Sequence, residues 1–426
     1  MSLEPHYDQN DPEASSSERE RERLEQARPI PRITIHAWCD SAGVQRPIER
    51  AAEDRRMARA HVMVHGGGVQ AAMEHYAQNT TPNLLLVETR VEPEYIMQQL
   101  SGLADVCDPS TRVVVIGHFN DVALYREMMR NGISEYMVAP VSLADLIATI
   151  ESIYSSENEA PIGRTIAFVG AKGGVGASTL AHNIAWSVTT LFDNDVVIAD
   201  MDLAFGTANI NFDQDPAQGI AEAVFTPERV DETYLDRLLA KCSERLSLLA
   251  APSTMERVYD FDEAAFAPIV EVMQATTPTV ILDVPHGWHG WTRRTLAEAD
   301  EVVVVATPEL TNLRNTKNFV DTLKRLRPND PPPHLILNQV GMPKRPEIDP
   351  EDFLEPLGIS SFVTIPFDPQ LFGTAATNGQ MLAEMNPSHA VVQKFDELAH
   401  VLTGRREVKS SQAGMLNSIL KKLKGK

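Results

Sequence analysis

Short apolar segments alternate with longer amphipathic segments along most of the chain, and this alternation limits the possible folds more strongly than the composition does. In a first series, apolar segments predict buried strands at 32–38, 61–65, 83–88, 112–117 and 135–139. The amphipathic segments predict helices at 47–59, 69–77, 92–100, 121–132 and 143–154. Repeated βα units of this length pack as a parallel sheet with helices on both faces.

A second series follows a polar join, SSENEAPIGR at 155–164. Its strands are predicted at 165–170, 195–200, 246–252, 278–285, 301–308, 334–340 and 362–368. The expected fold class is therefore α/β, with two doubly wound parallel-sheet domains over residues 30–155 and 160–404. Residues 1–29, rich in Ser, Glu and Arg, are predicted to be disordered, and residues 405–426 are expected to form a separate basic tail.

The composition disfavours several classes of protein. No run of about 18 apolar residues occurs, so no membrane-spanning helix is expected, and the polar N-terminus is unlike a signal peptide. Cys39, Cys107 and Cys242 lie far apart without a CxxC pair, which argues for a reducing compartment and against a zinc or iron–sulfur site. The formal net charge of −21 disfavours nonspecific DNA binding. The cytoplasm is the expected location.

The stretch AFVGAKGGVGASTLAHN at 167–183 joins a predicted strand to a predicted helix through a glycine-rich turn. This is the setting of a phosphate-binding loop, in which backbone N–H groups at a helix N-terminus surround phosphate oxygens, here those of Gly173, Gly174, Val175 and Gly176. Ser178 is placed to bind Mg²⁺ and Thr179 to contact a phosphate. Where such loops have a lysine, directly before this hydroxyl pair, the chain has Ala177. A glycine turn that binds no ligand is the simpler alternative.

The first predicted domain resembles the receiver domain of response regulators, most clearly over RVVVIGHFNDVALYREMMRNGISEYMVAPVSLADLIATI. A working receiver has an aspartate at the end of its third strand, a hydroxyl after the fourth and a lysine before the fifth-strand proline. The corresponding positions here are Glu88, Gly117–His118 and Ala139, and only Asp40 matches the magnesium-binding acids. The resemblance therefore implies an interaction domain that has lost phosphotransfer. Glu88 either imitates a phosphorylated aspartate or caps its strand.

The sequence KGGVGAST resembles the deviant phosphate loop of the MinD/ParA ATPases, in which a lysine before the glycines crosses a nucleotide-sandwiched dimer to the partner's phosphates. Lys172 stands at that position. The resemblance implies that ATP and Mg²⁺ are the cofactors and that the ATPase domain forms a homodimer. Because Ala177 removes one positive charge from the phosphates, it implies weaker binding and slow hydrolysis at best.

Later residues match the same family in the same order along the chain. VVIADMDLAFG carries Asp200 and Asp202, and PTVILDVPHG carries Asp283. The resemblance implies that Asp200 and Asp283 assist Mg²⁺ together with Ser178. It also implies that Asp202 orients the attacking water and that Lys172 compensates charge during hydrolysis. The residues implied to contact adenine lie in LILNQV and IPFDP, and they are Asn338, Pro366 and Asp368.

A degenerate receiver followed by a MinD-like ATPase with the loop GAKGGVGAST is similar to the CpaE/TadZ family of pilus-assembly proteins, over roughly residues 30–404. The similarity implies a cytoplasmic localisation factor at a cell pole, which recruits the machinery that assembles tight-adherence (Flp-type) pili. Other pilus-assembly proteins are then the expected partners.

The basic tail has the pattern of a short amphipathic helix. Its apolar side chains fall on one arc and its polar ones mainly opposite: Met415, Leu416, Ile419, Leu420 and Leu423 against Asn417, Lys421 and Lys424. Such a helix can lie at the inner face of the cytoplasmic membrane, and dimerisation would strengthen the contact through avidity. A solubilising tail and a helix docked on a partner stay open as alternatives.

Three other functions compete with the leading interpretation. A non-catalytic scaffold that binds ATP or nothing is favoured by Ala177, whereas Lys172, Asp200, Asp202 and Asp283 argue against complete decay. A ParA-type DNA-partitioning ATPase is disfavoured by the acidic charge. An electron-transfer relative of the nitrogenase iron protein is disfavoured by the isolated cysteines.

Overall fold

The computed structural model describes residues 20–405, except for residues 22, 26, 155–161, 255–256 and 360–361. The predicted tail lies outside the described residues apart from Arg405, and most of the predicted join also lies outside them. The chain divides into two compact units, the first of residues 1–162, 293–298 and 318–333 and the second of the remainder. In the part that the structure describes, every helix is too short or too polar to cross a membrane.

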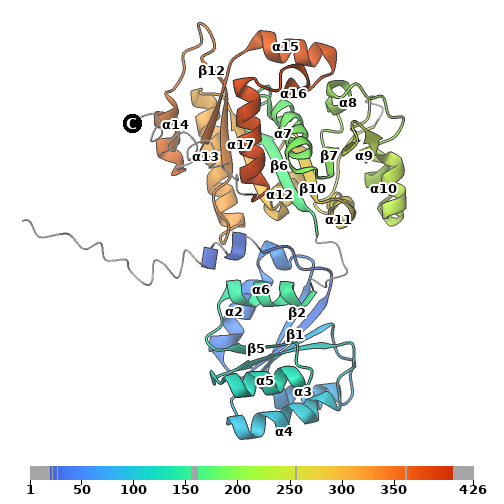
Figure 1. The fold of residues 1–426 in the computed structure, drawn as a ribbon, viewed down its shortest axis with the longest axis vertical. Coiled ribbons are helices and arrows are strands. Elements are labelled where there is room, and N and C mark those ends of the chain that lie inside the picture. The colour runs from blue at the N-terminus through green and yellow to red at the C-terminus, as the bar shows by residue number, and fades with distance from the viewer. Residues whose placement is uncertain are drawn as a thin grey trace, which may run out of the picture. The chain divides into compact units, whose positions relative to one another are not determined.

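The first unit is built on a five-stranded sheet in which all neighbouring strands are parallel, in the order β2-β1-β3-β4-β5 (Figure 1). Its strands are β1 (Thr34–Cys39), β2 (His61–Gly66), β3 (Leu84–Glu88), β4 (Arg112–Gly117) and β5 (Glu135–Val138). Its helices are α2 (Ala42–Ala52), η1 (Arg55–Met57), α3 (Gly68–Tyr76), α4 (Pro93–Ala104), α5 (Val122–Arg130) and α6 (Leu143–Tyr154). This strand order is that of a flavodoxin-like doubly wound fold, so the prediction for this part of the chain is confirmed.

The period-two alternation of strand side chains divides the core of this unit into two layers. Leu84 and Leu86 pack with α2 and α6 on one face, whereas Leu85 and Val87 pack with α3, α4 and α5 on the other. Because both faces are covered, the central strand β3 is buried along its whole length.

Two local predictions for this unit are wrong. Helix α2 begins at Ala42 and contains Pro47, which the sequence analysis took as the helix start; burial of Val44 against the sheet extends the helix toward its N-terminus despite the proline. The prediction of disorder up to residue 29 also fails where the structure describes that segment, because Leu24 and Ala27 are buried in the core. Isolated apolar residues in a polar stretch give no periodic signal.

The second unit is built on an eight-stranded sheet in the order β13-β12-β11-β6-β10-β7-β9-β8. Its strands are β6 (Arg164–Gly170), β7 (Val196–Asp200), β8 (Ala240–Lys241), β9 (Leu246–Leu249), β10 (Thr279–Val284), β11 (Glu301–Ala306), β12 (His334–Val340) and β13 (Phe362–Pro366). All neighbours are parallel except β8, which pairs antiparallel with β9. The wholly parallel sheet of the prediction is therefore corrected at this edge, because a two-residue strand has no readable period.

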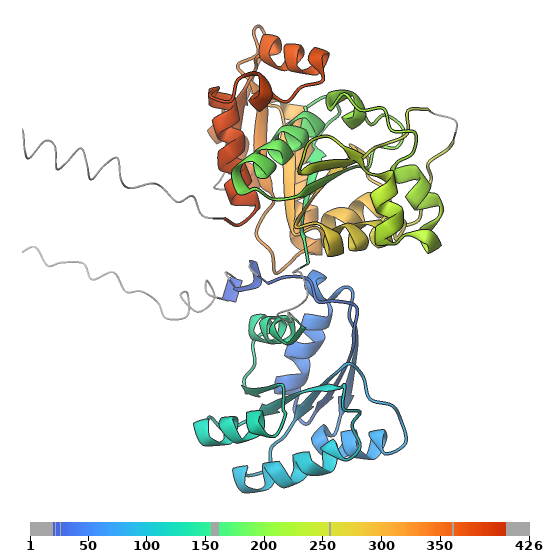
Figure 2. The same cartoon turned by 45° about the vertical axis from the view of Figure 1, so that its right-hand side comes forward.

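The helical elements that follow β6 complete this part of the chain. They are α7 (Ala177–Phe192), α8 (Ala208–Asn211), α9 (Ile220–Phe225), η2 (Pro227–Arg229), α10 (Glu232–Leu238), α11 (Ala267–Thr276), α12 (Gly290–Glu298), α13 (Leu310–Leu326), α14 (Pro350–Leu354), η3 (Glu355–Leu357), α15 (Pro369–Asn378), α16 (Leu382–Met385) and α17 (Ala390–Leu402). Helices α7 and α17 lie side by side on one face of the sheet (Figures 1 and 2). There Leu180, Ile184 and Phe395 pack on Phe168 and Ile281 in one buried cluster.

The strand order places the glycine-rich loop at a special point of this sheet. The connection from β6 leads through α7 to β7 on one side, whereas the connection from β10 leads through α12 to β11 on the other side of β6. In open parallel sheets, ligands bind at the carboxyl ends of the strands where the connections change direction. The loop after β6 lies at such a point.

Candidate functional site

The glycine-rich loop runs from the end of β6 into the first turn of α7. Gly174 and Gly176 have φ angles of +80° and +87°, which L-residues with side chains rarely adopt. A β-carbon at Gly176 would also lie 2.6 Å from Nδ2 of Asn338. The backbone path therefore favours glycine at positions 174 and 176, whereas Gly173 has neither a positive φ angle nor a close neighbour that would exclude a side chain.

Hydrogen bonds from other strands and helices hold this loop in place. The Ala171 N–H donates to the Val305 carbonyl at 2.8 Å, and the Ala171 carbonyl accepts from Nδ2 of Asn315 at 2.8 Å. Nδ2 of Asn338 donates to the Val175 carbonyl at 2.8 Å. Because the loop carbonyls are bonded behind the loop and the helix N-terminus has free N–H groups, the loop is preorganised for an anion.

Of the two loop positions at which a lysine was considered, position 172 is a lysine and position 177 is an alanine. Ala177 is the first residue of α7, and its half-buried methyl group packs against the core. Lys172 is half exposed, and its Nζ lies 3.7 Å from Oε2 of Glu309 in the same chain. The predicted role of Lys172 across a dimer stays a prediction.

Two buried carboxylates face each other at the carboxyl ends of neighbouring strands. Asp200 and Asp283 are register partners on β7 and β10, and both are almost fully buried. Burial, and then the charge of Asp283, raise the pKa of Asp200 to about 7. The Asp200 carboxylate accepts hydrogen bonds from the N–H groups of Asp202, at 3.2 Å, and Ala208, at 3.1 Å. A pair of buried acids in this arrangement favours the binding of a cation.

The predicted magnesium ligands come together around this pair. The Ser178 hydroxyl donates to Oδ1 of Asp283 at 3.1 Å. Hydroxyl and carboxylate oxygens are hard donors that suit Mg²⁺, which usually takes only one or two carboxylates and completes its shell with water and phosphate oxygens. Among the described residues no three His, Cys, Asp or Glu side chains are grouped as a complete metal site. The residues present therefore fit a magnesium ion that arrives with a phosphate ligand.

Asp202 lies apart from this buried pair. Its side chain is partly exposed, and its Oδ1 accepts from the Phe205 N–H at 3.0 Å. It lies two residues beyond Asp200, at the start of the segment that leads to α8. This position leaves the carboxylate accessible from outside, as its predicted contact with a water molecule requires.

His182 was not predicted as a site residue from the sequence, and the structure places it against one of the predicted magnesium ligands, Asp283. Its imidazole is fully buried, with Nε2 3.2 Å from Oδ2 of Asp283 and Nδ1 3.1 Å from Nδ2 of Asn211. The signal available in the sequence was its spacing of four residues after Ser178, which puts both side chains on one face of the helix.

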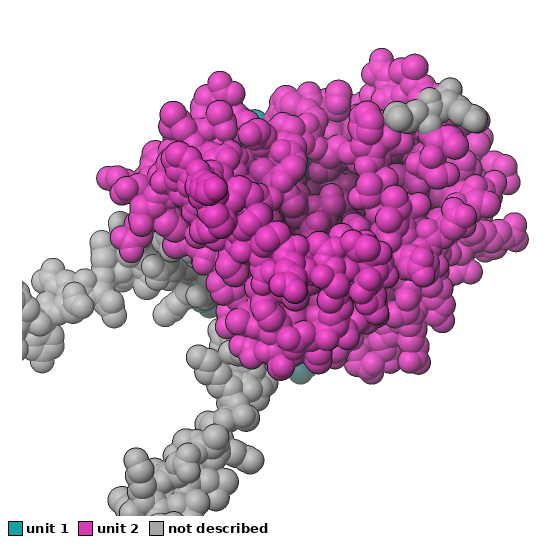
Figure 3. All heavy atoms as spheres, turned by 90° about the horizontal axis from the view of Figure 1, so that it is seen from above, with its two compact units in different colours: residues 1–162, 293–298, 318–333 teal, residues 163–292, 299–317, 334–426 magenta. Residues whose placement is uncertain are grey.

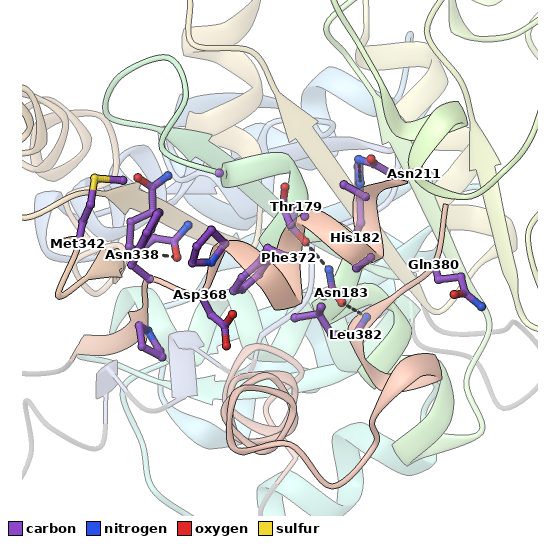
Figure 4. A pocket seen from close by; sticks show the side chains of 18 residues that line it. Thr179, His182, Asn183, Asn211, Asn338, Met342, Asp368, Phe372, Gln380 and Leu382 are labelled. Atoms are coloured by element: carbon purple, nitrogen blue, oxygen red, sulfur yellow. Dashed lines mark hydrogen bonds between the residues drawn. The ribbon is translucent and has the colours of Figure 1, made fainter. Parts of the chain in front are cut away.

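A cavity of about 460 Å³ adjoins the loop, between α7, the end of β12, and α15 and α16. Figure 3 shows the second unit hollowed near the middle of its upper face, and Figure 4 shows side chains that line the cavity. Asn338, Pro366 and Asp368, which were assigned to adenine, line it together with Gly176 and Thr179 of the loop. Lys172, Ser178, Asp200 and Asp283 are not part of its lining, whereas His182 and Asn211 are.

The three residues assigned to adenine differ in their present partners. Nδ2 of Asn338 is bonded to the loop, and its Oδ1 accepts from the Gln339 N–H at 2.9 Å. Asp368 caps α15 by accepting from the Leu371 N–H at 2.9 Å. Pro366 is exposed at the end of β13. Their contact with a base stays a prediction.

The acid position of the receiver-like unit is closed by internal hydrogen bonds. Oε2 of Glu88 accepts from the N–H groups of Asp40 and Ser41 at 2.7 and 2.8 Å, and Oε1 accepts from the Ser41 hydroxyl at 2.7 Å. Nε2 of His118 lies 3.0 Å from Oε1. Burial alone would raise the pKa of Glu88, but the hydrogen bonds from Ser41, His118 and the backbone hold it below its usual range. The carboxylate therefore bridges three loops, which goes beyond the strand cap considered from the sequence.

Comparison with known proteins agrees with this site. A family described as an AAA domain matches residues 163–333. The septum site-determining protein MinD of Synechocystis sp. is 26% identical over 281 residues, which are 62% of this chain and 99% of the relative. A ParA family ATPase structure from Chlorobium tepidum is 22% identical, covers 56% of this chain and 98% of its own, and has a TM-score of 0.51, which shows the shared fold. Fold and site together define an AAA ATPase of the MinD/ParA class.

The N-terminal region identifies the family more closely. It matches the crystal structure of the pilus assembly protein CpaE from Caulobacter crescentus, with 46% identity over 30% of this chain and 98% of that chain and a TM-score of 0.30. On the strength of this sequence identity, the chain belongs to the CpaE family of pilus-assembly proteins, and the resemblance noted from the sequence is confirmed.

Proposed function

We propose that the chain is an ATP-dependent localisation factor for the assembly of tight-adherence (Flp-type) pili, in which ATP binding to the second unit controls dimerisation. The observation that carries this proposal is the juxtaposition of a preorganised glycine loop, a buried acid pair and a cavity of about 460 Å³. A mononucleotide needs an anion cradle, a magnesium site and a pocket for its base, and all three adjoin one another here.

Each part of the site has a separate task in binding. The loop N–H groups of residues 173–179 would hold the phosphates, and the helix dipole of α7 would add favourable potential. Ser178, Asp200 and Asp283 would hold Mg²⁺, which supplies charge neutralisation on the phosphates. The base would enter the cavity beside Asn338.

Hydrolysis is expected to be slow. In phosphoryl transfer, charge spreads over the phosphate oxygens in the transition state and is compensated by cations. Ala177 contributes none, so compensation would fall to Mg²⁺ and to Lys172 of the partner in a dimer, while Asp202 would orient the attacking water. The slow step would make the nucleotide-bound dimer long-lived, which suits a positioning role.

The proposed nucleotide-dependent dimerisation also indicates which partners the chain would bind. A homodimer would form through the ATPase unit, and the receiver-like unit, whose acid position is occupied by Glu88, would act as a docking module for other pilus-assembly proteins. The basic tail would place the dimer at the inner face of the cytoplasmic membrane at a cell pole.

A second candidate function is a scaffold that binds ATP without hydrolysing it, or binds no nucleotide. Ala177 and the closed Glu88 network favour it, since neither unit keeps the lysine that its catalytic relatives use. Retention of the buried Asp200–Asp283 pair favours the first proposal, because such a pair costs stability without a cation.

Size-resolved binding tests the proposal. The purified chain is studied by light scattering with and without Mg-ATP, bound nucleotide is quantified, and phosphate release is followed. A nucleotide-dependent dimer with slow phosphate release is expected. A dimer without any release would support the scaffold that uses ATP as a clamp, and absence of nucleotide binding would refute the proposed site.

A further inference from the structure

We propose that His182 is a positioning residue for the magnesium site, which fixes the carboxylate of Asp283 from the side opposite Ser178 and ties it to the segment that contains α8. The inference rests on the proposed nucleotide-binding function and deepens it. It concerns the residues that surround the metal ligands rather than the ligands themselves.

The first step is the arrangement on α7. Ser178 and His182 are separated by four residues, so their side chains emerge on the same helical face. The Ser178 hydroxyl contacts Oδ1 of Asp283, and His182 Nε2 lies 3.2 Å from Oδ2. One helix face therefore faces both oxygens of one carboxylate, Oδ1 through a hydrogen bond from Ser178 and Oδ2 through the nearby imidazole of His182.

The second step is the orientation of the imidazole. Nδ2 of Asn211 is a donor, and its distance of 3.1 Å from His182 Nδ1 makes that ring nitrogen the acceptor. The hydrogen of the neutral ring is then on Nε2, the nitrogen that faces Asp283. The ring of Phe212 packs beside the imidazole with a centroid separation of 5.3 Å. Two consecutive residues at the end of α8 thus hold the imidazole in place.

The third step is the state of the Nε2 donor. It is fully buried and has no aligned hydrogen-bond acceptor among the described residues, even though the Asp283 carboxylate is within 3.2 Å. A buried donor without an aligned acceptor is costly, so the imidazole favours the orientation of Asp283 in which Oδ2 accepts the Nε2 hydrogen. Groups that orient metal ligands in this way commonly change metal affinity when they are removed.

The segment that contains α8 contacts the surroundings of both acids, so its movement would affect the proposed magnesium site. The segment between Asp200 and Asn211 begins in the acid pair and ends at the histidine. The Ala208 N–H donates to Asp200, while Asn211 contacts His182. A shift of this segment would therefore reach both magnesium carboxylates, one through a backbone N–H and one through the imidazole.

The test compares how much Mg²⁺ strengthens nucleotide binding in the full chain. Affinity for fluorescent N-methylanthraniloyl-ADP is measured in EDTA and in saturating Mg²⁺ for the wild type, His182→Leu, His182→Gln and Asn211→Ala. Ser187→Ala is the control, because Ser187 is also buried on α7 and does not contact the acids. Leucine removes the N–H donor, whereas glutamine can restore one.

The Mg²⁺-dependent gain in affinity should fall about tenfold in His182→Leu, fall less in His182→Gln and Asn211→Ala, and stay unchanged in Ser187→Ala. Because His182 and Asn211 also line the cavity that would hold the base, each variant is judged by the ratio of its affinities in Mg²⁺ and in EDTA, which a change in base binding alone would leave unaltered. An undiminished gain in His182→Leu would overturn the role of His182 alone. If His182→Leu does not fold, an undiminished gain in both His182→Gln and Asn211→Ala overturns it. A wild type that binds no nucleotide would overturn the proposed site and the inference together.

Discussion

Replacement of Asp200 by Asn should stabilise the metal-free protein at alkaline pH, although it removes a residue of the proposed magnesium site. In the folded chain the pKa of Asp200 is raised from 3.8 to about 7 by burial and by Asp283. Asp200 therefore destabilises the folded state increasingly as the pH rises from its unfolded pKa toward its folded pKa, and by a constant amount above that.

The size of this effect follows from the shift. About three pKa units at 1.36 kcal/mol each correspond to about 4 kcal/mol of destabilisation at pH 8. Asparagine loses one of the two charge-assisted hydrogen bonds, from Asp202 and Ala208, at a cost of about 1 kcal/mol. Asp200→Asn should therefore be about 3 kcal/mol more stable than the wild type at pH 8, and the two proteins should be about equal near pH 4.5.

Urea unfolding in EDTA between pH 4.5 and pH 8 measures this difference. Trp186, Trp288 and Trp291 all lie in the second unit, so tryptophan fluorescence reports mainly on its unfolding. Asp202→Asn serves as the control, since its side chain is partly exposed. If Asp200→Asn runs parallel to the wild type over the whole pH range, or is less stable at pH 8, the buried acid pair does not carry the strain assigned to it.

Three further perturbations test other parts of the argument. Lys172→Ala should abolish nucleotide-dependent dimerisation while ATP binding to the monomer persists, as measured by light scattering and bound nucleotide; an unchanged monomer–dimer balance would refute the cross-dimer role. Ala177→Lys should restore a phosphate contact and strengthen ATP binding about tenfold or more, and unchanged affinity in equilibrium dialysis would mean that position 177 does not face the phosphates. Glu88→Leu should destabilise the first unit by about 3 kcal/mol or more, because it removes the buried carboxylate that accepts the hydrogen bonds of the Asp40 and Ser41 N–H groups and of the Ser41 hydroxyl. The stability that Glu88 contributes is present above the pKa of its unfolded state and is lost as the pH falls through its lowered folded pKa. Urea midpoints of wild type and variant that keep the same separation down to pH 3 would therefore contradict this role of Glu88.

The repeating βα pattern can be predicted from the amino-acid sequence alone, as can most strand positions and the composition of the glycine loop. These are local properties: strand burial is visible as an unbroken apolar run, and a glycine loop between strand and helix needs only neighbouring residues to form. The proximity of the acids at the ends of β7 and β10 could also be predicted, because the carboxyl ends of parallel strands meet at one edge of the sheet.

Which of these residues meet, and through which partners, depends on contacts between distant segments of the chain. His182 is one histidine on an apolar helix in the sequence, and its importance arises from Asp283, about a hundred residues away, and Asn211 on α8. Glu88 became a bridge between loops because Ser41 and His118 converge on it from two other segments. Local periodicity encodes burial, but the identity of a buried neighbour depends on chain segments whose separation along the sequence carries no signal of their contact.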